Sequence, residues 1–192
     1  MGLCRYLAPG RRLNLVAVAS GMVFLYVVLV GDYWWVSTGV GGKPTFMAGV
    51  APYRIDIIVL ERDVDVPAIP FIEASGLLTY LYISLGSILA GLFPGHRYIR
   101  RLIGYKAILA PLVTAISIYL GVLAAGNFFG LPIPYVGYSV VRLRFFAEGM
   151  AITTETPVYS GFTEAFYLVV VASVLALAGK LVMRCIEVDE EA

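Results

Sequence analysis

Four long apolar segments, separated by shorter polar ones, dominate the pattern of this chain of 192 residues. Each segment is long enough to cross about 30 Å of hydrocarbon as a helix that rises about 1.5 Å per residue. The first does not look like a cleaved signal peptide, because its apolar run is longer than an h-region and no small-residue cleavage site follows it. The pattern predicts one polytopic membrane domain over residues 1–192, with transmembrane helices at residues 13–31, 71–93, 107–129 and 161–183.

The two longer connections, residues 32–70 and 130–160, contain the alternation of apolar and polar residues that is typical of β-strands. In the first connection, one face of an extended segment is formed by Tyr53, Ile55, Ile57 and Val59. Residues 32–39 and 45–50 are weaker strand candidates. The first connection is therefore expected to hold strands and not a disordered linker.

The second connection has the pattern of a β-hairpin. Arg142 and Arg144 alternate with apolar residues, and a second β-prone run, residues 150–158, follows a short turn at residues 147–149 that ends in glycine. Because isolated two-stranded hairpins are only marginally stable in water, we expect both connections to pair into one small antiparallel sheet. In that sheet we expect Asp56 to lie across strands from Arg142 or Arg144.

The distribution of basic residues predicts the orientation in the membrane. Nine of the 14 Lys and Arg residues belong to three short segments, which are the two chain ends and the connection between the second and third helices: Arg5, Arg11, Arg12, Arg97, Arg100, Arg101, Lys106, Lys180 and Arg184. Cytoplasmic loops of membrane proteins carry an excess of Lys and Arg. We therefore expect both termini in the cytoplasm and the sheet on the outer side of the plasma membrane.

Composition agrees with a membrane protein, since 60% of the residues are hydrophobic and 14% are charged. A soluble domain carries about 25% charged residues. The net charge of +1 gives no electrostatic reason to expect nucleic acid as a partner. The chain has no Gln and only two Asn, a scarcity that indicates a thermophilic source.

Aromatic residues lie at the outer ends of the predicted helices, where Trp, Tyr and Phe commonly anchor a protein at the membrane interface. The chief candidates for such anchors are Trp34, Trp35, Phe128 and Phe129.

Two acids, Glu73 and Glu164, lie near the outer beginnings of the second and fourth apolar segments. Acids within membrane segments are often functional because burial of their charge is costly. A carboxylate is also stabilised by the dipole at a helix N-terminus. We favour the second interpretation; the first remains open and requires the two carboxylates within about 4–6 Å of each other, with one pKa raised.

Metal or cofactor binding finds little support in the sequence. Glu61, Asp63 and Asp65 would share one side of an extended segment and suit a hard cation, but no glycine-containing binding loop accompanies them, and alternating acids also blunt a sheet edge. His96 is the only histidine, so haem ligation by two histidines and multi-histidine metal sites are excluded. We expect neither metal nor cofactor.

Small residues recur at a spacing of four in the second and third segments, and such a spacing lets helix backbones approach closely. These residues are Gly86 and Ala90 in the second segment and Ser117, Gly121 and Ala125 in the third. They predict either packing inside the bundle or a surface for another membrane subunit or a second copy.

The layout resembles that of claudin-type tetraspan proteins, which have four helices, cytoplasmic termini, a longer first and a shorter second outer loop, and β-strands in both. The resemblance covers the whole chain but only as topology. Claudin-type proteins carry an outer-loop tryptophan followed by two cysteines. Here Trp34 and Trp35 are present but the loops contain no cysteine, so the barrier and adhesion roles of that family are not expected.

The sequence favours a non-enzymatic membrane scaffold or accessory subunit, which acts on partners through its sheet and its small-residue helix faces within the lipid bilayer. The alternative is a subunit of an oligomeric pore or transporter. A third reading is a membrane enzyme that uses Glu73 and Glu164 at the outer face.

The predicted orientation is testable at the two cysteines, Cys4 and Cys185, which lie in the chain ends. We expect both thiols to react in intact cells with membrane-permeant reagents and not with impermeant ones. Mass spectrometry of the labelled chain measures this. Labelling of either cysteine from outside the cell contradicts the orientation.

Overall fold

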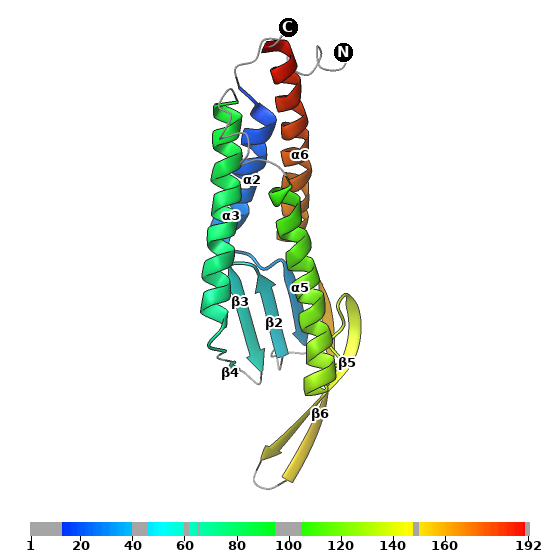
Figure 1. Ribbon diagram of the computed structural model, residues 1–192. Helices are drawn as coiled ribbons and strands as arrows, with labels where there is room; N and C mark the ends of the chain where they lie inside the picture. Colours follow the sequence, from blue (N-terminus) through cyan, green and yellow to red (C-terminus); the bar gives the residue numbers. More distant parts are fainter. Residues whose placement is uncertain are drawn as a thin grey trace. The chain divides into compact units, whose positions relative to one another are not determined.

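A computed structural model describes residues 13–39, 46–59, 62–64, 66–94, 105–147 and 150–190. The helices in these residues are α2 (Leu15–Val30), α3 (Ile69–Leu92), α5 (Lys106–Phe129) and α6 (Glu164–Glu190). The strands are β1 (Trp35–Gly39), β2 (Phe46–Ala51), β3 (Arg54–Val59), β4 (Arg62–Asp63), β5 (Gly137–Ala147) and β6 (Met150–Phe162) (Figure 1).

The chain divides into two compact units. The helix unit comprises Met1–Asp32, Ala74–Leu112 and Tyr167–Ala192, and the sheet unit comprises Tyr33–Glu73 and Val113–Phe166. Each unit is described by itself below.

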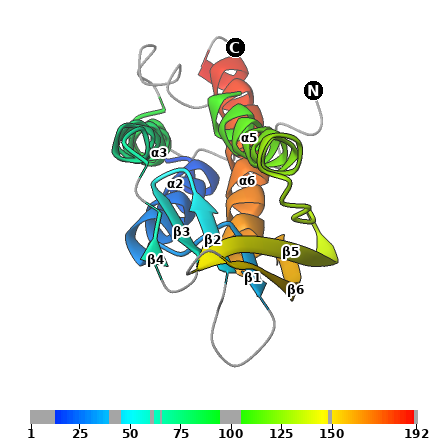
Figure 2. The same ribbon diagram turned by 90° about the horizontal axis from the view of Figure 1, so that it is seen from below.

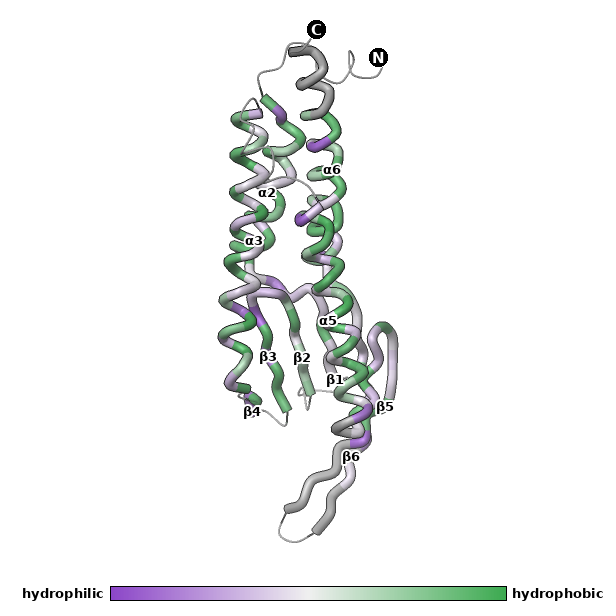
Figure 3. The backbone as a smooth tube through the Cα atoms, in the orientation of Figure 1, coloured by the Kyte–Doolittle hydropathy of each residue, from purple (hydrophilic) through white to green (hydrophobic). Residues whose placement is uncertain are grey.

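All four predicted apolar segments are helical, and three contain a stretch that is long and apolar enough to cross a membrane: Ile69–Leu92, Lys106–Asn127 and Glu164–Met183 (Figure 3). The first helix, α2, has only 16 residues, which is about 24 Å of helix. Both of its ends are capped. The Asn14 side chain accepts a hydrogen bond from the backbone N–H of Ala17, and Gly31 ends the helix in the left-handed conformation at φ 73°.

In the helix unit, the buried residue Asn14 connects three helices. Its side-chain Nδ2 donates to the carbonyl of Gly179 on α6 at 2.6 Å, and its backbone N–H donates to the carbonyl of Gly91 on α3 at 2.8 Å. Both glycines are needed for this close approach. A Cβ at Gly91 would lie 2.7 Å from the Asn14 carbonyl oxygen, and one at Gly179 would lie 3.1 Å from Ala17.

Buried serine hydroxyls add further bonds between helices of this unit. Each donates to a backbone carbonyl of a neighbouring helix: Ser20 to Ala172 at 2.7 Å, Ser84 to Gly21 at 2.9 Å and Ser173 to Ala107 at 2.7 Å. Interhelical hydrogen bonds of this kind are common between helices in a membrane.

The sheet unit contains one antiparallel sheet in the order β4-β3-β2-β1-β6-β5 (Figure 2). Strand β1 pairs with β2 on one side and with β6 on the other, so the two long connections form a single sheet as predicted. The predicted hairpin is also confirmed, since β5 and β6 pair over eleven residue pairs from Gly137↔Ser160 to Ala147↔Met150.

The expected contact between Asp56 and Arg142 or Arg144 is wrong. Asp56 lies on β3 and both arginines lie on β5, and the strand order places β2, β1 and β6 between those two strands. Arg142 instead pairs with Glu155 of β6 at 2.8 Å, and Asp56 pairs with Arg54 at 2.8 Å. The hairpin joins the sheet through β6, which leaves β5 on the far edge.

The core of the sheet unit forms between the sheet and the part of α5 within this unit. Trp35 packs there with Ile118 of α5 and with Val141 and Val158 of the hairpin, and its indole N–H donates to the carbonyl of Tyr135 at 2.7 Å. Trp34 and Trp35 are 0% and 2% exposed. Both indoles are therefore buried within the sheet unit, and their position at the membrane interface stays a prediction.

The pairing of β1 with β6 centres on a buried contact between two serines. Ser160 Oγ donates to Ser37 Oγ at 2.7 Å, and the two residues are also register partners. Substitution Ser160→Ala leaves the Ser37 hydroxyl buried without this partner, so we expect a loss of about 1–3 kcal/mol in the free energy of unfolding.

The double variant Ser37→Ala/Ser160→Ala should lose less than the sum of the two single variants, because no unpaired hydroxyl remains. Chemical unfolding in detergent, monitored by tryptophan fluorescence, measures the free energy of unfolding of the three variants. Additive losses contradict the coupling of the two hydroxyls.

Candidate functional site

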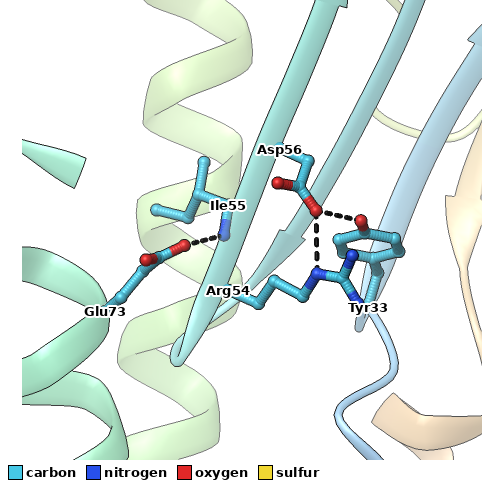
Figure 4. A network of polar contacts seen from close by, with 5 residues as sticks. All are labelled: Tyr33, Arg54, Ile55, Asp56 and Glu73. Atoms are coloured by element: carbon cyan, nitrogen blue, oxygen red, sulfur yellow. Dashed lines mark hydrogen bonds and ion pairs between the residues drawn. The ribbon is translucent and has the colours of Figure 1, made fainter. Parts of the chain in front are cut away.

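A network of polar side chains in the sheet unit is the strongest candidate for a site (Figure 4). The Tyr33 hydroxyl donates to Asp56 Oδ2, and Arg54 Nε donates to the same oxygen at 2.8 Å. The Arg54 guanidinium carbon also lies 4.7 Å from the centroid of the Tyr33 ring. One carboxylate oxygen thus accepts from both a phenol and a guanidinium.

The local backbone explains how Tyr33 reaches Asp56. Arg54 and Asp56 lie two residues apart on β3, so their side chains leave the strand on the same face. Between β1 and β3 lies Gly49 of β2, the register partner of Asp56. A Cβ at Gly49 would lie 2.6–2.8 Å from ring atoms of Tyr33, so the ring crosses the sheet where β2 has no side chain.

The electrostatics of the network fix its protonation state. The hydrogen bond from Tyr33, followed by that from Arg54, lowers the pKa of Asp56. Burial, followed by the hydrogen bond to Asp56, raises the pKa of Tyr33 to about 12. Near neutral pH the network therefore holds a carboxylate, a protonated phenol and a guanidinium. The stability that Asp56 contributes is present above its unfolded pKa and is lost as the pH falls through its lower folded pKa.

Glu73 supports the same strand from α3. Its Oε1 accepts a hydrogen bond from the backbone N–H of Ile55 at 2.6 Å. Strand β4 pairs with β3 only at Ile58 and Val59. The outer edge of β3 at Ile55 therefore has no strand partner, and the Glu73 carboxylate accepts the hydrogen bond that the carbonyl of such a strand would accept. Helix α3 begins at Ile69, and Glu73 is therefore beyond the first turn and not the helix-start carboxylate that we favoured.

Glu164 does occupy the first turn of α6 and is exposed, in agreement with the helix-start interpretation. No hydrogen bond or ion pair joins Glu73 to Glu164 among the contacts of the described residues. The structure thus assigns the two acids separate positions, one at the edge of β3 and one at the beginning of α6.

The acidic row of the first connection is described only in part. Asp63 is exposed on β4, whereas Glu61 and Asp65 lie outside the described residues. Within the described part of the chain, no group of three or more His, Cys, Asp or Glu side chains is arranged to hold a metal ion.

The small residues at four-residue spacing have two different environments. Gly86 and Ala90 are buried in the helix unit, where they serve packing. In the sheet unit, Ser117 and Gly121 are exposed and Ala125 is half-buried, and a Cβ at Gly121 would have no atom within 4 Å. The side chains of Phe128 and Phe129 lie outside the described part of the structure.

The sequence analysis did not identify several residues that hold the helix unit or the sheet unit together. Asn14 stands directly before an apolar run, which is an N-cap signal. Gly49 interrupts a strand candidate, and a glycine in a strand often marks a close approach of other groups. The pair Ser37 and Ser160 gives no such signal, because two residues 123 positions apart become partners only through the sheet topology.

Comparison with known proteins gives no match: the chain matches no protein-family model, no curated protein and no solved structure.

Substitution Glu73→Ala removes the acceptor of the Ile55 amide. We expect a loss of about 1–3 kcal/mol in the free energy of unfolding and faster hydrogen exchange at Ile55. Glu73→Gln keeps an oxygen acceptor without the charge and should lose about 1 kcal/mol.

Glu164→Gln is the matched control, with an expected loss of about 0.3–1 kcal/mol through the helix dipole and unchanged exchange at Ile55. Mass-spectrometric hydrogen exchange in detergent measures the difference. Unchanged protection of the Ile55 amide in Glu73→Ala contradicts the assigned role.

Proposed function

We propose that this chain is a multi-pass protein of the plasma membrane that serves as a non-enzymatic scaffold or accessory subunit and binds a protein partner through its sheet. In this proposal the chain crosses the membrane four times, with both termini in the cytoplasm and the sheet outside, a layout like that of claudins. The three span-length helices and the basic residues at the predicted inner flanks support the proposal.

The short helix α2 is compatible with a fourth crossing. It carries exposed apolar side chains along its length, among them Met22, Tyr26 and Leu29, which suit contact with lipid. A helix shorter than the hydrocarbon thickness is accommodated by local thinning of the bilayer at a modest cost.

The observation that carries the proposal is the exposed face of the β5–β6 hairpin, here called the hairpin face. It consists of three cross-strand pairs: Tyr138↔Tyr159, Val140↔Pro157 and Arg142↔Glu155. Tyr138 and Tyr159 are 76% and 46% exposed, with ring centroids 4.8 Å apart. Arg142 and Glu155 form an ion pair at 2.8 Å.

Alternation along the strands explains why this face is free. Val141, Val158 and Ser160 point to the opposite face and are buried, where Val141 and Val158 pack in the core with Ile118 of α5. The residues between them must then face outward. Tyr and Arg are enriched in protein interfaces, and a contiguous exposed apolar surface typically marks an interaction site.

The two edge strands of the sheet differ, and this difference also favours binding at the β5–β6 hairpin. Strand β4 has two residues, both charged and exposed, and a short charged edge discourages further pairing. Strand β5 has eleven residues without proline and ends the strand order. A long edge strand offers unpaired backbone groups to an extended segment of another chain.

The polar network described above supports a role without catalysis. Asp56, Tyr33 and Arg54 satisfy one another, and Glu73 satisfies a backbone amide of the same strand. These contacts give each group a structural task within the sheet unit.

The test is the mass of the complex after extraction from the membranes of the cells that express it, in mild detergent. We expect the 20.8 kDa chain in a larger complex of discrete mass. The variant Tyr138→Ser/Tyr159→Ser should break that complex, because it removes both exposed rings of the hairpin face.

Tyr26→Ser, which changes an exposed tyrosine of α2, is the matched control and should leave the complex intact. A monomeric wild-type chain, or a complex that survives the double substitution, contradicts the proposal. A closed ring of copies that survives it would instead favour an oligomeric pore.

A further inference from the structure

The first residue of α5, Lys106, contacts the middle of α3 in the helix unit. Its Nζ atom lies 4.9 Å from the centroid of the Tyr82 ring and donates to the Tyr82 hydroxyl at 3.3 Å. The carbonyl of the next residue, Ala107, accepts a hydrogen bond from Ser173 Oγ of α6 at 2.7 Å. Tyr82 lies 13 residues after the first residue of its span-length segment and ten before the last, and Ser173 lies nine after and ten before. Helix α5 therefore begins at the central level of both neighbours.

Helix α2 has its own middle at the same level. Ser84 of α3 donates to the carbonyl of Gly21, and Ser20 donates to the carbonyl of Ala172 on α6. Gly21 lies near the middle of α2. When α2, α3 and α6 cross a bilayer, the Lys106 ammonium therefore lies near the middle of the hydrocarbon layer and not among the headgroups.

The helix unit offers Lys106 no carboxylate at this level. Its acids are Asp32 and those of residues 187–191, which follow the apolar segments of α2 and α6. Residues 74–147, which include the connection before α5, contain no acid. Tyr82 holds the ammonium by its hydroxyl and ring but supplies no formal negative charge. A cation at this depth without a counter-charge is costly, and such residues commonly pair with an opposite charge.

The surface around Lys106 is exposed and apolar. Lys106 is itself exposed, and so is Tyr82. Residues at positions 78, 82, 85 and 89 share one face of α3 by helical spacing. The exposed apolar side chains next to the pair are Leu78, Leu85 and Leu89 on α3 and Leu109 on α5. A helix within the bilayer can therefore reach the ammonium from the lipid side.

We propose that Lys106 forms an ion pair with a carboxylate at the middle of a transmembrane helix of a partner protein. The partner helix packs on the apolar side chains around Lys106, and its acid supplies the negative charge that the helix unit lacks at this depth. The inference rests on the membrane-embedded helix unit of the proposed function, but it uses a surface other than the hairpin face.

A second copy of the chain does not fit this role. The only acids in the three span-length segments are Glu73 and Glu164. Glu164 lies nine residues from Ser173, which is about 13 Å of helix away from the central level. Glu73 lies farther from that level on α3 and already accepts a hydrogen bond from the Ile55 amide. The partner is therefore a different chain with an acid at mid-membrane depth.

The test uses the full chain in phosphatidylcholine vesicles together with a synthetic helix of about 20 leucine and alanine residues that carries one central Glu. Fluorescence energy transfer between a donor on the chain and an acceptor on the peptide measures their association. We expect the central-Glu peptide to associate about tenfold more tightly than the same peptide with a central Gln. Lys106→Gln should remove this difference, and Lys106→Glu should prefer a peptide with a central Lys.

Lys180→Gln is the matched control and should keep the preference for Glu. Lys180 also rests on a tyrosine ring, with its Nζ 4.0 Å from the centroid of Tyr105, but it lies three residues from the end of the α6 segment. A peptide with its Glu two turns from the centre should associate no better than the Gln peptide.

Flotation of the vesicles first shows whether the chain is inserted. A chain that is not inserted contradicts the proposed function together with this inference. An inserted wild-type chain that associates equally with the Glu and Gln peptides overturns this inference alone, even if a variant fails to fold. Loss of the Glu preference on addition of millimolar inorganic phosphate would also overturn it, because Lys106 would then bind a soluble anion.

Discussion

The sheet unit depends on one interaction, the antiparallel pairing of β1 with β6. It joins strands from connections far apart in the sequence, and the bond between Ser37 and Ser160 lies inside it. Without this pairing, β1 to β4 and the β5–β6 hairpin would be two separate small sheets, and small isolated sheets are weak in water. The register also decides the surface, because a slip by one residue would bury Tyr138 and expose Val141. The free hairpin face is thus a consequence of the same pairing that builds the core.

A second constraint runs through both units: an apolar chain has few polar side chains, and several of those described in its interior bond to the backbone. Asn14, Ser20 and Ser84 bond to carbonyls of neighbouring helices, and Glu73 bonds to a strand amide. The three bonds between helices also specify which helices meet in the helix unit. Ser87 Oγ is the one buried side-chain nitrogen or oxygen atom of the described residues without a hydrogen-bond partner.

The sequence predicts elements better than contacts, for physical reasons that particular residues make clear. Length and hydrophobicity identify the helices, and alternation identifies the strands of both connections. The ends of the helices and strands are harder to predict. Asn14 and Gly31 cap α2 and make it shorter than expected, and β6 continues to Phe162, where a helix was expected. Alternation assigns a residue to a face of the sheet but does not give the strand order. The contact predicted between Asp56 and the arginines of β5 was wrong for this reason. The pattern that marks Trp35 as aromatic at a helix end cannot distinguish an interfacial ring from a buried one.

The candidate site shows the same limit. Glu73 was a candidate because it is an acid in an apolar segment. Its role is to accept a hydrogen bond from the Ile55 amide, which has no strand partner, and only the sheet topology shows this. Asp56 and Glu155 are likewise paired within the sheet unit. The cations of the helix unit differ, since Lys106 and Lys180 rest on rings and have no carboxylate among the described residues. Charge that the fold leaves open is available to molecules outside it.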